Sequence, residues 1–329
     1  MKEADFWKIR SDGKIACLLC PHVCKLNDGE VGYCNARQRK GDKLYSLNYG
    51  LITSMAMDPI EKKPLYHFHP GAYILSVGTF GCSFHCLFCQ NASISQGPPH
   101  GSEITAQEII VIAKDRKSLG VAYTYNEPMI WMEFVRECAE LARAEGLKNV
   151  LVSNGYVNPE PLRELLPFID AANIDLKSLD DSFYRNICKG KLHPVQNTCI
   201  KMKEAGVHVE VTNLVIPGEN DSDENFIKLR DWVHDNLGPE TVVHLSAYFP
   251  HYKFRAPSTP LSTLHRARDI VQEKINYVYL GNVVNPSSGD TACYNCGATL
   301  VRRSGYRIDT SGMEDNLCAA CLSPTPFVS

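Results

Sequence analysis

Three cysteines stand close together in one short segment and offer the ligands of a metal cluster. Cys82, Cys86 and Cys89 lie within the run Gly81 to Gln90, with the spacing C-x-x-x-C-x-x-C. Thiolates bind iron–sulfur cubanes, which contain four irons, so three thiolates leave one iron without a protein ligand. An open metal position usually serves chemistry, because a substrate or cofactor can occupy it, whereas a closed site is usually structural.

The same loop has a second interpretation as a zinc knuckle or a group of buried thiols. In that interpretation His85 supplies the missing ligand, although zinc knuckles usually combine one C-x-x-C with another. The position of the loop favours the iron–sulfur cluster. It follows an apolar stretch, 72–78, that predicts a buried strand, and parallel barrels place their active sites at the ends of their strands.

Eight further cysteines form two sets near the ends of the chain: Cys17, Cys20, Cys24 and Cys34, and Cys293, Cys296, Cys318 and Cys321. The C-terminal set consists of two C-x-x-C pairs and predicts one closed tetrahedral site for structural zinc or a single iron. Metal binding would largely fold this short module. The N-terminal set fits a second iron–sulfur cluster or zinc, because thiolates alone do not select between soft-ligand metals.

The other candidate ligands have simpler interpretations. His22 could replace one N-terminal thiolate, but a histidine beside a proline more often lies at the surface or behind the ligands. His67 and His69 are expected to pack rather than to bind metal. The three scattered cysteines are expected to be ordinary buried or half-buried thiols; they are Cys138, Cys188 and Cys199.

Composition indicates a cytoplasmic enzyme. The chain has 329 residues, 44% hydrophobic content and a net charge of -3, which fits one large domain with attachments. Eleven of the 14 cysteines fall into three compact sets, which in an intracellular enzyme indicates metal rather than disulfides. The charge predicts no nucleic-acid binding. No apolar stretch is long enough to cross a bilayer, and the charged residues 1–14 do not form a secretory signal.

The central part of the chain alternates six times between strand and helix patterns. Because each parallel crossover must be long enough to contain a helix, this alternation predicts a partial (β/α)6 barrel. We expect strands at 72–80, 120–126, 148–154, 171–177, 208–216, 241–249 and 277–281. We expect helices at 105–118, 129–145, 158–168, 181–205, 222–236 and 260–274. The predicted parts are an N-terminal cysteine-rich module (1–70), the barrel (71–283) and a C-terminal zinc-ribbon or rubredoxin-like module (284–329).

The predicted strands carry polar residues on one face. Side chains alternate between the two faces of a strand, so one face would carry Asp175, Lys177, Glu210, Thr212, His244, Ser246 and Tyr248. The other face would meet the outer helices through Ile174, Leu176, Val211, Leu245 and Ala247. Unpaired polar groups are costly in a filled core, so the pattern predicts an open barrel with a ligand cavity. The alternative is that these residues bond the loops at the strand ends.

The cysteine loop at a strand end resembles the signature of the radical S-adenosylmethionine (radical SAM) enzymes. In that family SAM chelates the open iron, and an electron from the reduced cluster cleaves its sulfonium to a 5'-deoxyadenosyl radical. The resemblance implies that Tyr125, Asn126 and Glu127, followed by Pro128, replace a Gly-Gly-Glu-Pro segment that binds the SAM amine. In this chain the glycines are replaced, and the Glu-Pro part matches well.

Two further strand ends resemble the branch of the superfamily that activates glycyl-radical enzymes. The resemblance places Asn154 and Lys177 near SAM or the substrate, and Asp175 where it helps to bind a cation. The chain departs from the activating enzymes of pyruvate formate-lyase at three positions, where Val152, Thr212 and Phe249 replace an aspartate, an arginine and a histidine. A short shift would instead place His251 at the histidine's position. Losing a bidentate arginine changes how a carboxylate can be bound, so the substrate does not transfer.

Three segments resemble the radical SAM component of the AmmeMemoRadiSam system, over essentially the whole chain. They are 17–34 with its four cysteines, 61–68 (EKKPLYHF) and 122–128 (AYTYNEP). This resemblance implies a 4Fe-4S enzyme supplied by reduced ferredoxin or flavodoxin, with a protein substrate from the associated families. Glycyl-radical activation competes with modification of another protein, a peptide or a small molecule. A non-catalytic scaffold with three metal clips is the alternative from a different class.

Overall fold

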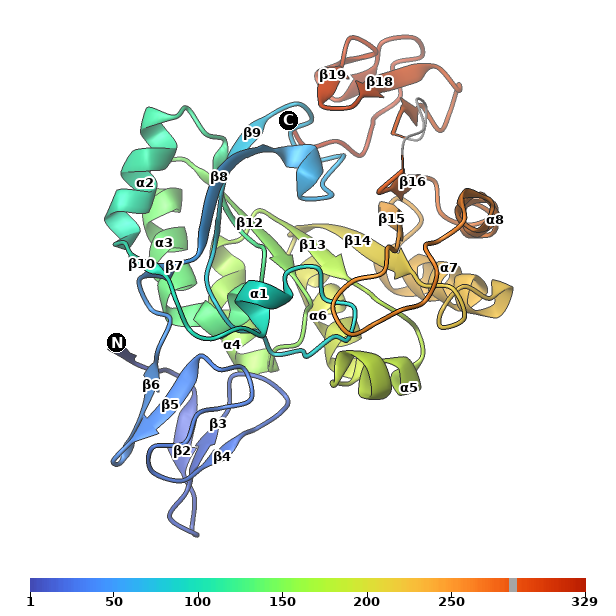
Figure 1. Ribbon diagram of the computed structural model, residues 1–329. Coiled ribbons are helices and arrows are strands. Elements are labelled where there is room, and N and C mark those ends of the chain that lie inside the picture. The colour runs from blue at the N-terminus through green and yellow to red at the C-terminus, as the bar shows by residue number, and fades with distance from the viewer. Residues whose placement is uncertain (284–288) are drawn as a thin grey trace.

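The computed structural model describes residues 1–283 and 289–329 (Figure 1). A large sheet with its helices forms the centre, and two small β-rich modules lie at opposite ends of it (Figure 1). The predicted C-terminal module was expected to begin at residue 284, and its first five residues, 284–288, lie outside the described part of the chain.

The central sheet has eight strands within the described residues, in the order β16-β15-β14-β13-β12-β11-β9-β8. Seven of them run parallel to one another: β9 (Tyr73–Gly78), β11 (Gly120–Tyr123), β12 (Lys148–Ser153), β13 (Ala171–Asp175), β14 (His208–Val215), β15 (Val243–Ala247) and β16 (Val278–Gly281). The strand β8 (Ser54–Pro59) pairs antiparallel with β9 and comes from the first 70 residues. The predicted barrel of the (β/α)6 type is confirmed.

The helices follow the strands as the alternation predicts. They are α2 (Ala106–Asp115), α3 (Met132–Ala144), α4 (Pro159–Leu165), α5 (Asp181–Phe183), α6 (Leu192–Glu204), α7 (Asp223–Leu237) and α8 (Leu261–Val271), with the short α1 (Ala92–Ser95) after the cysteine loop. The start of α2 is fixed by a capping box between Thr105 and Glu108, in which side chains satisfy backbone N–H groups that have no partner in the helix. The 3-10 turns η2 (Pro128–Trp131) and η3 (Leu166–Phe168) flank α3 and α4.

The single helix predicted at 181–205 is wrong, because the segment is divided into three pieces. The π-helical turn η4 (Tyr184–Cys188) follows α5 and ends at Lys189, whose φ of 65° is left-handed. Gly190 then passes so close to the Phe84 ring that a Cβ on it would lie 2.1 Å from the ring edge. A helical backbone cannot continue through these two residues, so α6 starts anew at Leu192.

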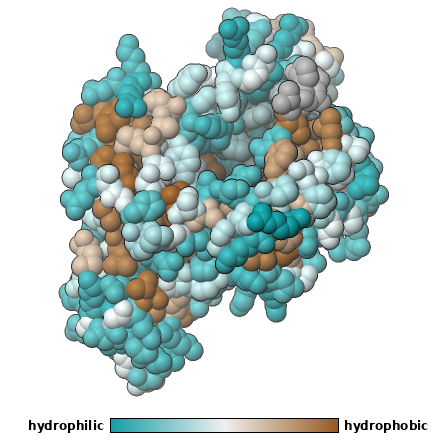
Figure 2. Space-filling model, in the orientation of Figure 1, coloured by the Kyte–Doolittle hydropathy of each residue, from teal (hydrophilic) through white to brown (hydrophobic). Residues whose placement is uncertain are grey.

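The face predicted to meet the helices does so. Ile174, Leu176, Val211, Leu245 and Ala247 are all buried in the main hydrophobic core. Much of the surface in view is hydrophilic, and hydrophobic residues gather over α2 (Figure 2). None of the helices described for this chain has the length and apolar character to cross a membrane.

The opposite face of several strands is filled with apolar side chains, which corrects the prediction of a polar lumen for this region. Near the amino ends of the strands, residues of the sheet pack against the segment that contains the 3-10 turn η1 (Ile60–Lys62). This second cluster comprises Ile60, Leu65, Phe68, Ile74, Ala122, Val150 and Ala171. Segment 60–68 therefore plugs this end of the barrel, and a ligand must bind toward the carboxyl ends.

The N-terminal module consists of two three-stranded sheets. One contains β1 (Lys2–Glu3), β6 (Lys43–Ser46) and β5 (Arg37–Lys40), and the other β2 (Trp7–Ile9), β3 (Ile15–Cys17) and β4 (Lys25–Leu26). A buried ion pair of 2.7 Å between Arg37 and Glu133 joins the module to α3. The linking strand β7 (Leu51–Ile52) pairs with β10 (Ser102–Glu103).

The C-terminal module docks on the plugged end of the barrel. Its strands are β17 (Thr291–Ala292), β18 (Thr299–Ser304), β19 (Arg307–Asp309), β20 (Met313–Glu314) and β21 (Leu317–Cys318). The Arg303 guanidinium donates to the Tyr66 carbonyl at 2.6 Å. The ring of Phe327 stacks on that of His67, with centroids 4.1 Å apart. The chain's two cysteine-rich modules thus occupy the two ends of the barrel.

Candidate functional site

The three cysteines of the predicted cluster lie in the loop between β9 and α1, at the carboxyl end of the sheet. Cys86 is buried, and Cys82 and Cys89 are half-buried. The Phe84 N–H lies 3.3 Å from the Cys82 Sγ, and the hydroxyl of Ser95 lies 3.1 Å from the Cys89 Sγ. Hydrogen-bond donors beside a sulfur favour its thiolate form, which is the form that binds metal.

The loop is fixed by backbone contacts to distant segments. Gly81 has a φ of 86°, and a Cβ on it would lie 2.3 Å from the carbonyl oxygen of Cys34. On the other side, the His85 N–H donates to the Cys188 carbonyl at 3.1 Å, and the Leu87 N–H donates to the Ile187 carbonyl at 3.1 Å. The N-terminal module and η4 therefore clamp the loop from two sides.

The protonation of the three thiols differs. Burial raises the pKa of Cys82 well above its usual range, and the carboxyl of Glu127 raises it further. Burial also raises the pKa of Cys89. The pKa of Cys86 is lowered, first by a hydrogen bond with the Cys188 thiol and also by the Lys177 ammonium, against burial. Thiolates at Cys82 and Cys89 thus need a nearby cation, and iron fits this set of ligands.

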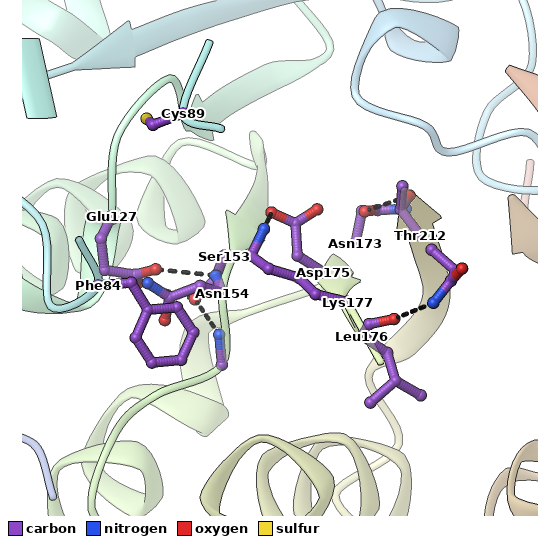
Figure 3. Close-up of polar contacts among 12 residues, drawn as sticks. Phe84, Cys89, Glu127, Ser153, Asn154, Asn173, Asp175, Leu176, Lys177 and Thr212 are labelled. Atoms are coloured by element: carbon purple, nitrogen blue, oxygen red, sulfur yellow. Dashed lines mark hydrogen bonds and ion pairs between the residues drawn. The ribbon is translucent and has the colours of Figure 1, made fainter. Parts of the chain in front are cut away.

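Glu127 is completely buried and joins the ends of β11 and β12. Its Oε1 accepts hydrogen bonds from the Met129 N–H at 2.9 Å and the Ser153 hydroxyl at 2.7 Å. Its Oε2 accepts from the Asn154 N–H at 2.8 Å. Burial raises the pKa of Glu127 to about 7, although these hydrogen bonds oppose the shift. The carboxylate therefore positions the backbone of Asn154 (Figure 3).

Asn154 links the third strand to the cysteine loop. Its Nδ2 lies 3.1 Å from the Ser83 hydroxyl and 3.5 Å from the Cys82 Sγ. Its Oδ1 accepts from the Tyr156 N–H at 2.8 Å. The Asn154 side chain thus contacts the loop that carries the three cysteines, called the cluster loop below. Glu127 fixes the backbone of Asn154.

Tyr125 has a backbone conformation that is unusual for a residue with a side chain. Its φ of 72° lies in the left-handed region that favours glycine. Its hydroxyl donates to the Asp58 carboxylate at 2.7 Å, and the Lys63 ammonium donates to the same oxygen at 2.7 Å. Burial raises the pKa of Asp58, but hydrogen bonds from Lys63, Lys62 and Tyr125 outweigh it and lower the pKa well below the usual range.

The side chain of Asn126 is hydrogen-bonded to the cysteine loop and to the residue that follows β9. Its Nδ2 donates to the Gly81 carbonyl at 2.9 Å, and its Oδ1 accepts from the Thr79 N–H at 3.2 Å. These two bonds tie the end of β11 to the start of the cysteine loop. The segment 125–127 is therefore placed beside the cluster loop, as its position in the sequence predicts.

Asp175 and Lys177 form an ion pair of 2.7 Å at the end of β13 (Figure 3). Burial lowers the pKa of Lys177, but the charge of Asp175 and the thiols of Cys86 and Cys188 raise it well above its usual range. The Lys177 ammonium also lies 5.7 Å from the centroid of the Phe88 ring in the cysteine loop. On the neighbouring strand, Thr212 donates to the Asn173 Oδ1 at 2.9 Å.

Glu210 was expected on a ligand-binding lumen but serves the plug. It is fully buried, and its carboxylate accepts from the backbone N–H groups of Tyr66 at 3.0 Å and His67 at 2.7 Å. The Nε2 atoms of His208 and His244 lie 3.0 and 2.6 Å from it. Two of these four contacts fix segment 60–68, so the alternative that strand residues bond loops is correct here.

The N-terminal cysteines gather beside the cluster loop. Burial raises the pKa of Cys20 well above its usual range, and the neighbouring thiols of Cys34, Cys17 and Cys24 raise it further. The Tyr33 N–H lies 3.4 Å from the Cys24 Sγ. His22 lies 2.8 Å from the Ser83 carbonyl through its Nε2, so it contacts the loop behind the thiols.

The C-terminal cysteines have the geometry of a single tetrahedral ion. Among residues 1–283 and 289–329, Cys293, Cys296, Cys318 and Cys321 are the one group of at least three potential ligands whose atoms all lie within 4.8 Å of one another. The Cys293–Cys321 and Cys296–Cys318 sulfurs are 3.8 and 3.7 Å apart. Four sulfurs at a Zn–S distance of about 2.3 Å in a tetrahedron lie about 3.8 Å apart. Hydrogen bonds from Ser323 and Asn295 lower the pKa of Cys321 to about 6.

The three remaining cysteines are buried, as expected, but Cys188 is not isolated. Cys138 lies in α3 and Cys199 in α6. The Cys188 carbonyl accepts from the His85 N–H at 3.1 Å, and the Cys188 thiol lowers the pKa of Cys86. Sequence reasoning also missed Asp58, since the antiparallel strand that carries it was not expected. No local signal marks either contact, because each joins segments far apart in the chain.

Comparison with known proteins identifies relatives over the whole chain. Residues 76–230 match the family model described as the radical SAM superfamily. The chain is 41% identical over 328 residues to the uncharacterized protein MJ0808 of Methanocaldococcus jannaschii, covering 98% of both chains. It is 26% identical over 176 residues to the pyruvate formate-lyase 1-activating enzyme of Escherichia coli, covering 51% of this chain and 71% of that enzyme.

A solved structure agrees with the fold. The radical SAM methyltransferase of Sphaerobacter thermophilus superposes with a TM-score of 0.53 at 18% sequence identity, covering 70% of this chain and 71% of the other. At this identity the likeness concerns the fold alone.

Proposed function

This chain belongs to the radical SAM superfamily, and from that premise we propose that it uses a 4Fe-4S cluster to cleave SAM reductively and abstract hydrogen from a substrate. Cys82, Cys86 and Cys89 bind the cluster. When bound, the cluster and SAM supply an electron and a sulfonium whose cleavage gives methionine and a carbon radical. The observation that carries the proposal is the loop of three thiols at the carboxyl end of the barrel, which is fixed by backbone contacts and has the Lys177 ammonium 5.7 Å from the ring centroid of its Phe88.

The surrounding residues support the proposal through their positions. Lys177 and Asp175 present one positive and one negative group at the end of β13, where the amine and carboxylate of SAM need opposite partners. Asn154 contacts the loop, and Glu127 fixes it there. Tyr125 and Asn126 place the end of β11 against the same loop. The plugged amino end confines the substrate to this side.

A protein substrate is the finer part of the proposal. The similarity to a pyruvate formate-lyase-activating enzyme favours hydrogen abstraction from a protein partner, and the AmmeMemoRadiSam resemblance adds partners from the associated families. The electron donor we propose is reduced ferredoxin or flavodoxin, in the cytoplasm. Modification of a small molecule or a peptide is the second candidate, because Val152 and Thr212 replace residues of the activating enzymes.

Turnover of SAM tests the proposal directly. Anaerobically reconstituted and reduced protein is expected to release 5'-deoxyadenosine and methionine, measured by chromatography. Cys82→Ala, Cys86→Ala and Cys89→Ala are each expected to abolish release, whereas Cys138→Ala, at a buried thiol in α3, is expected to retain it. Release that survives all three loop substitutions would refute the proposal.

Electron paramagnetic resonance of candidate partners separates the two kinds of substrate. After incubation with the reduced enzyme and SAM, a protein-based glycyl radical on a partner would support activation. Turnover that depends on a small molecule and leaves the partners without a radical would favour the second candidate.

A further inference from the structure

The two terminal cysteine sets differ in the spacing of their sulfurs. In the C-terminal set all four ligand atoms lie within 4.8 Å of one another, as one tetrahedral ion requires. Within the described ranges 1–283 and 289–329, neither the N-terminal cysteines nor the loop cysteines provide three sulfurs that close together. In a cubane each thiolate binds a different iron, so the sulfurs stand farther apart. The N-terminal set thus resembles the loop rather than the zinc-type site.

The N-terminal set also packs directly on the cluster loop. His22 contacts the Ser83 carbonyl at 2.8 Å through its Nε2. A Cβ at residue 81 would lie 2.3 Å from the Cys34 carbonyl oxygen, so only a glycine at this position allows the two segments to approach this closely. These contacts leave no layer of side chains between the two loops at this point.

Tyr33 joins the two cysteine sets. Its backbone N–H lies 3.4 Å from the Cys24 Sγ, and its carbonyl lies 3.0 Å from the His85 Nε2. Its ring stacks on that of His85, with centroids 3.9 Å apart and an angle of 17° between the planes. His85 in turn lies between Cys82 and Cys86 in the loop. One residue therefore touches a ligand of one set and the loop of the other.

We propose that Cys17, Cys20, Cys24 and Cys34 bind a second 4Fe-4S cluster, which passes electrons one at a time to the cluster at Cys82, Cys86 and Cys89. Four thiolates give each iron of the second cluster a protein ligand, so it has no open position for a substrate and serves electron transfer. Tunnelling rates fall exponentially with distance, and the contact through Tyr33 and His85 keeps this distance short. The relay rests on the proposed function of the loop cluster.

The electron balance of the relay is simple. An external low-potential one-electron donor loses one electron to the N-terminal cluster. That cluster returns to its oxidised form when the electron moves to the loop cluster. No bond forms or breaks, and no proton is transferred.

Metal content tests the second cluster without reference to SAM. A Cys82→Ala, Cys86→Ala and Cys89→Ala triple variant, reconstituted anaerobically, is expected to retain about four irons per chain and a cubane signal in Mössbauer spectra. Zinc in place of iron at the N-terminal set would overturn the proposal. The wild-type chain is expected to bind about eight cluster irons, four in each cluster. A wild-type content of about four irons would also overturn the proposal, so the test does not depend on whether the triple variant folds.

A matched substitution separates the zinc-type site from the cluster. Replacing both Cys293 and Cys318 by serine is expected to remove one zinc and leave the cubane irons and their spectra unchanged, since the C-terminal module lies at the other end of the barrel. A loss of cubane iron in this variant would place the second cluster at the C-terminal cysteines instead of the N-terminal ones, and would refute the proposal.

The contact between the clusters has its own spectroscopic readout. In the fully reduced wild-type protein the two paramagnetic clusters are expected to broaden each other's resonance, whereas the triple variant is expected to show one unbroadened signal. Two signals without mutual broadening would refute the relay. If the protein does not release 5'-deoxyadenosine, only the proposed function is contradicted. The second cluster is tested separately, because the iron content of the triple variant does not depend on SAM cleavage.

Discussion

Glu127 is a buried acceptor for three hydrogen bonds at the edge of the cluster loop. Glu127→Gln replaces one acceptor oxygen by an NH2 group, which would face a donor such as the Asn154 N–H. A buried donor left without a partner costs about 1–3 kcal/mol. We therefore expect the free energy of unfolding to fall by about that amount, measured by chemical denaturation. Glu140→Gln, on the exposed face of α3, is the control and should change little.

Cys188 is the residue that tunes the loop rather than ligating it. Its thiol lowers the pKa of Cys86, and a group that favours the thiolate also stabilises the more negative, reduced cluster. Cys188→Ala is therefore expected to keep the iron content and lower the reduction potential of the loop cluster, measured by redox titration with electron paramagnetic resonance. Cys199→Ala, at a fully buried thiol of α6, should leave the potential unchanged. Loss of iron in Cys188→Ala would instead make this residue a ligand.

At the scale of elements, the turn after β9 depends on a glycine that packs against another module. Gly81→Ala places a Cβ against the Cys34 carbonyl and also disfavours the left-handed φ of 86°. Gly146→Ala has the same backbone cost, with a φ of 72°, but meets nothing within 4 Å. Comparing the two isolates the clash, which we expect to destabilise Gly81→Ala by about 1–3 kcal/mol more in chemical denaturation. Equal losses of unfolding free energy in the two variants would show that the cysteine loop can move away from the Cys34 carbonyl without cost.

The elements that follow a local period could be predicted from the sequence. The alternation of strands and helices, the capping box at Thr105 and the parity of Ile174 and Leu176 are confirmed, because each depends on neighbouring residues. The break at Gly190 could not be predicted, since its cause is the ring of Phe84, which lies 106 positions away in the numbering. Local patterns do not encode which loops meet.

The candidate site shows the same division. The spacing of Cys82, Cys86 and Cys89 was sufficient to find the loop, and the paired C-x-x-C motifs were sufficient to find the C-terminal set. The contacts that fix the loop were not foreseen, because Tyr33 and His85 are joined only by folding. The inward position of Glu210 was predicted correctly, but the prediction that it lines a ligand cavity was wrong. Its carboxylate instead accepts hydrogen bonds from segment 60–68.

At the scale of the whole molecule, the two terminal modules have separate tasks at the two ends of the barrel. The N-terminal module contacts the cluster loop through His22 and Tyr33. The C-terminal module contacts the plug through Arg303 and Phe327. The plug in turn is bonded to Glu210 inside the barrel. Disturbing the C-terminal contact should therefore loosen the closed end without touching the cluster loop.

The histidine at this closed end makes its stability depend on pH. Burial lowers the pKa of His67 from 6.5 to about 3; Glu210 raises it, and Arg303, His208 and His244 lower it. Between these two pH values the unfolded chain binds a proton that the folded chain does not. Stability is therefore expected to fall as the pH drops from 6.5 toward 3.

His67→Phe tests this dependence and retains a ring that can stack on Phe327. The variant cannot take up the proton, so its free energy of unfolding should fall less steeply below pH 6.5, by up to about 1.4 kcal/mol per pH unit relative to the wild type. Denaturation at pH values from 6.5 to about 5.5 measures the difference, because this range stays about one pH unit above the value of 4.5 at which Glu210 titrates in the unfolded chain. His193→Phe, at an exposed position of α6, should follow the wild-type slope. Parallel slopes for wild type and His67→Phe would show that the closed end opens without unfolding, because His67 would then be free to titrate in the folded chain.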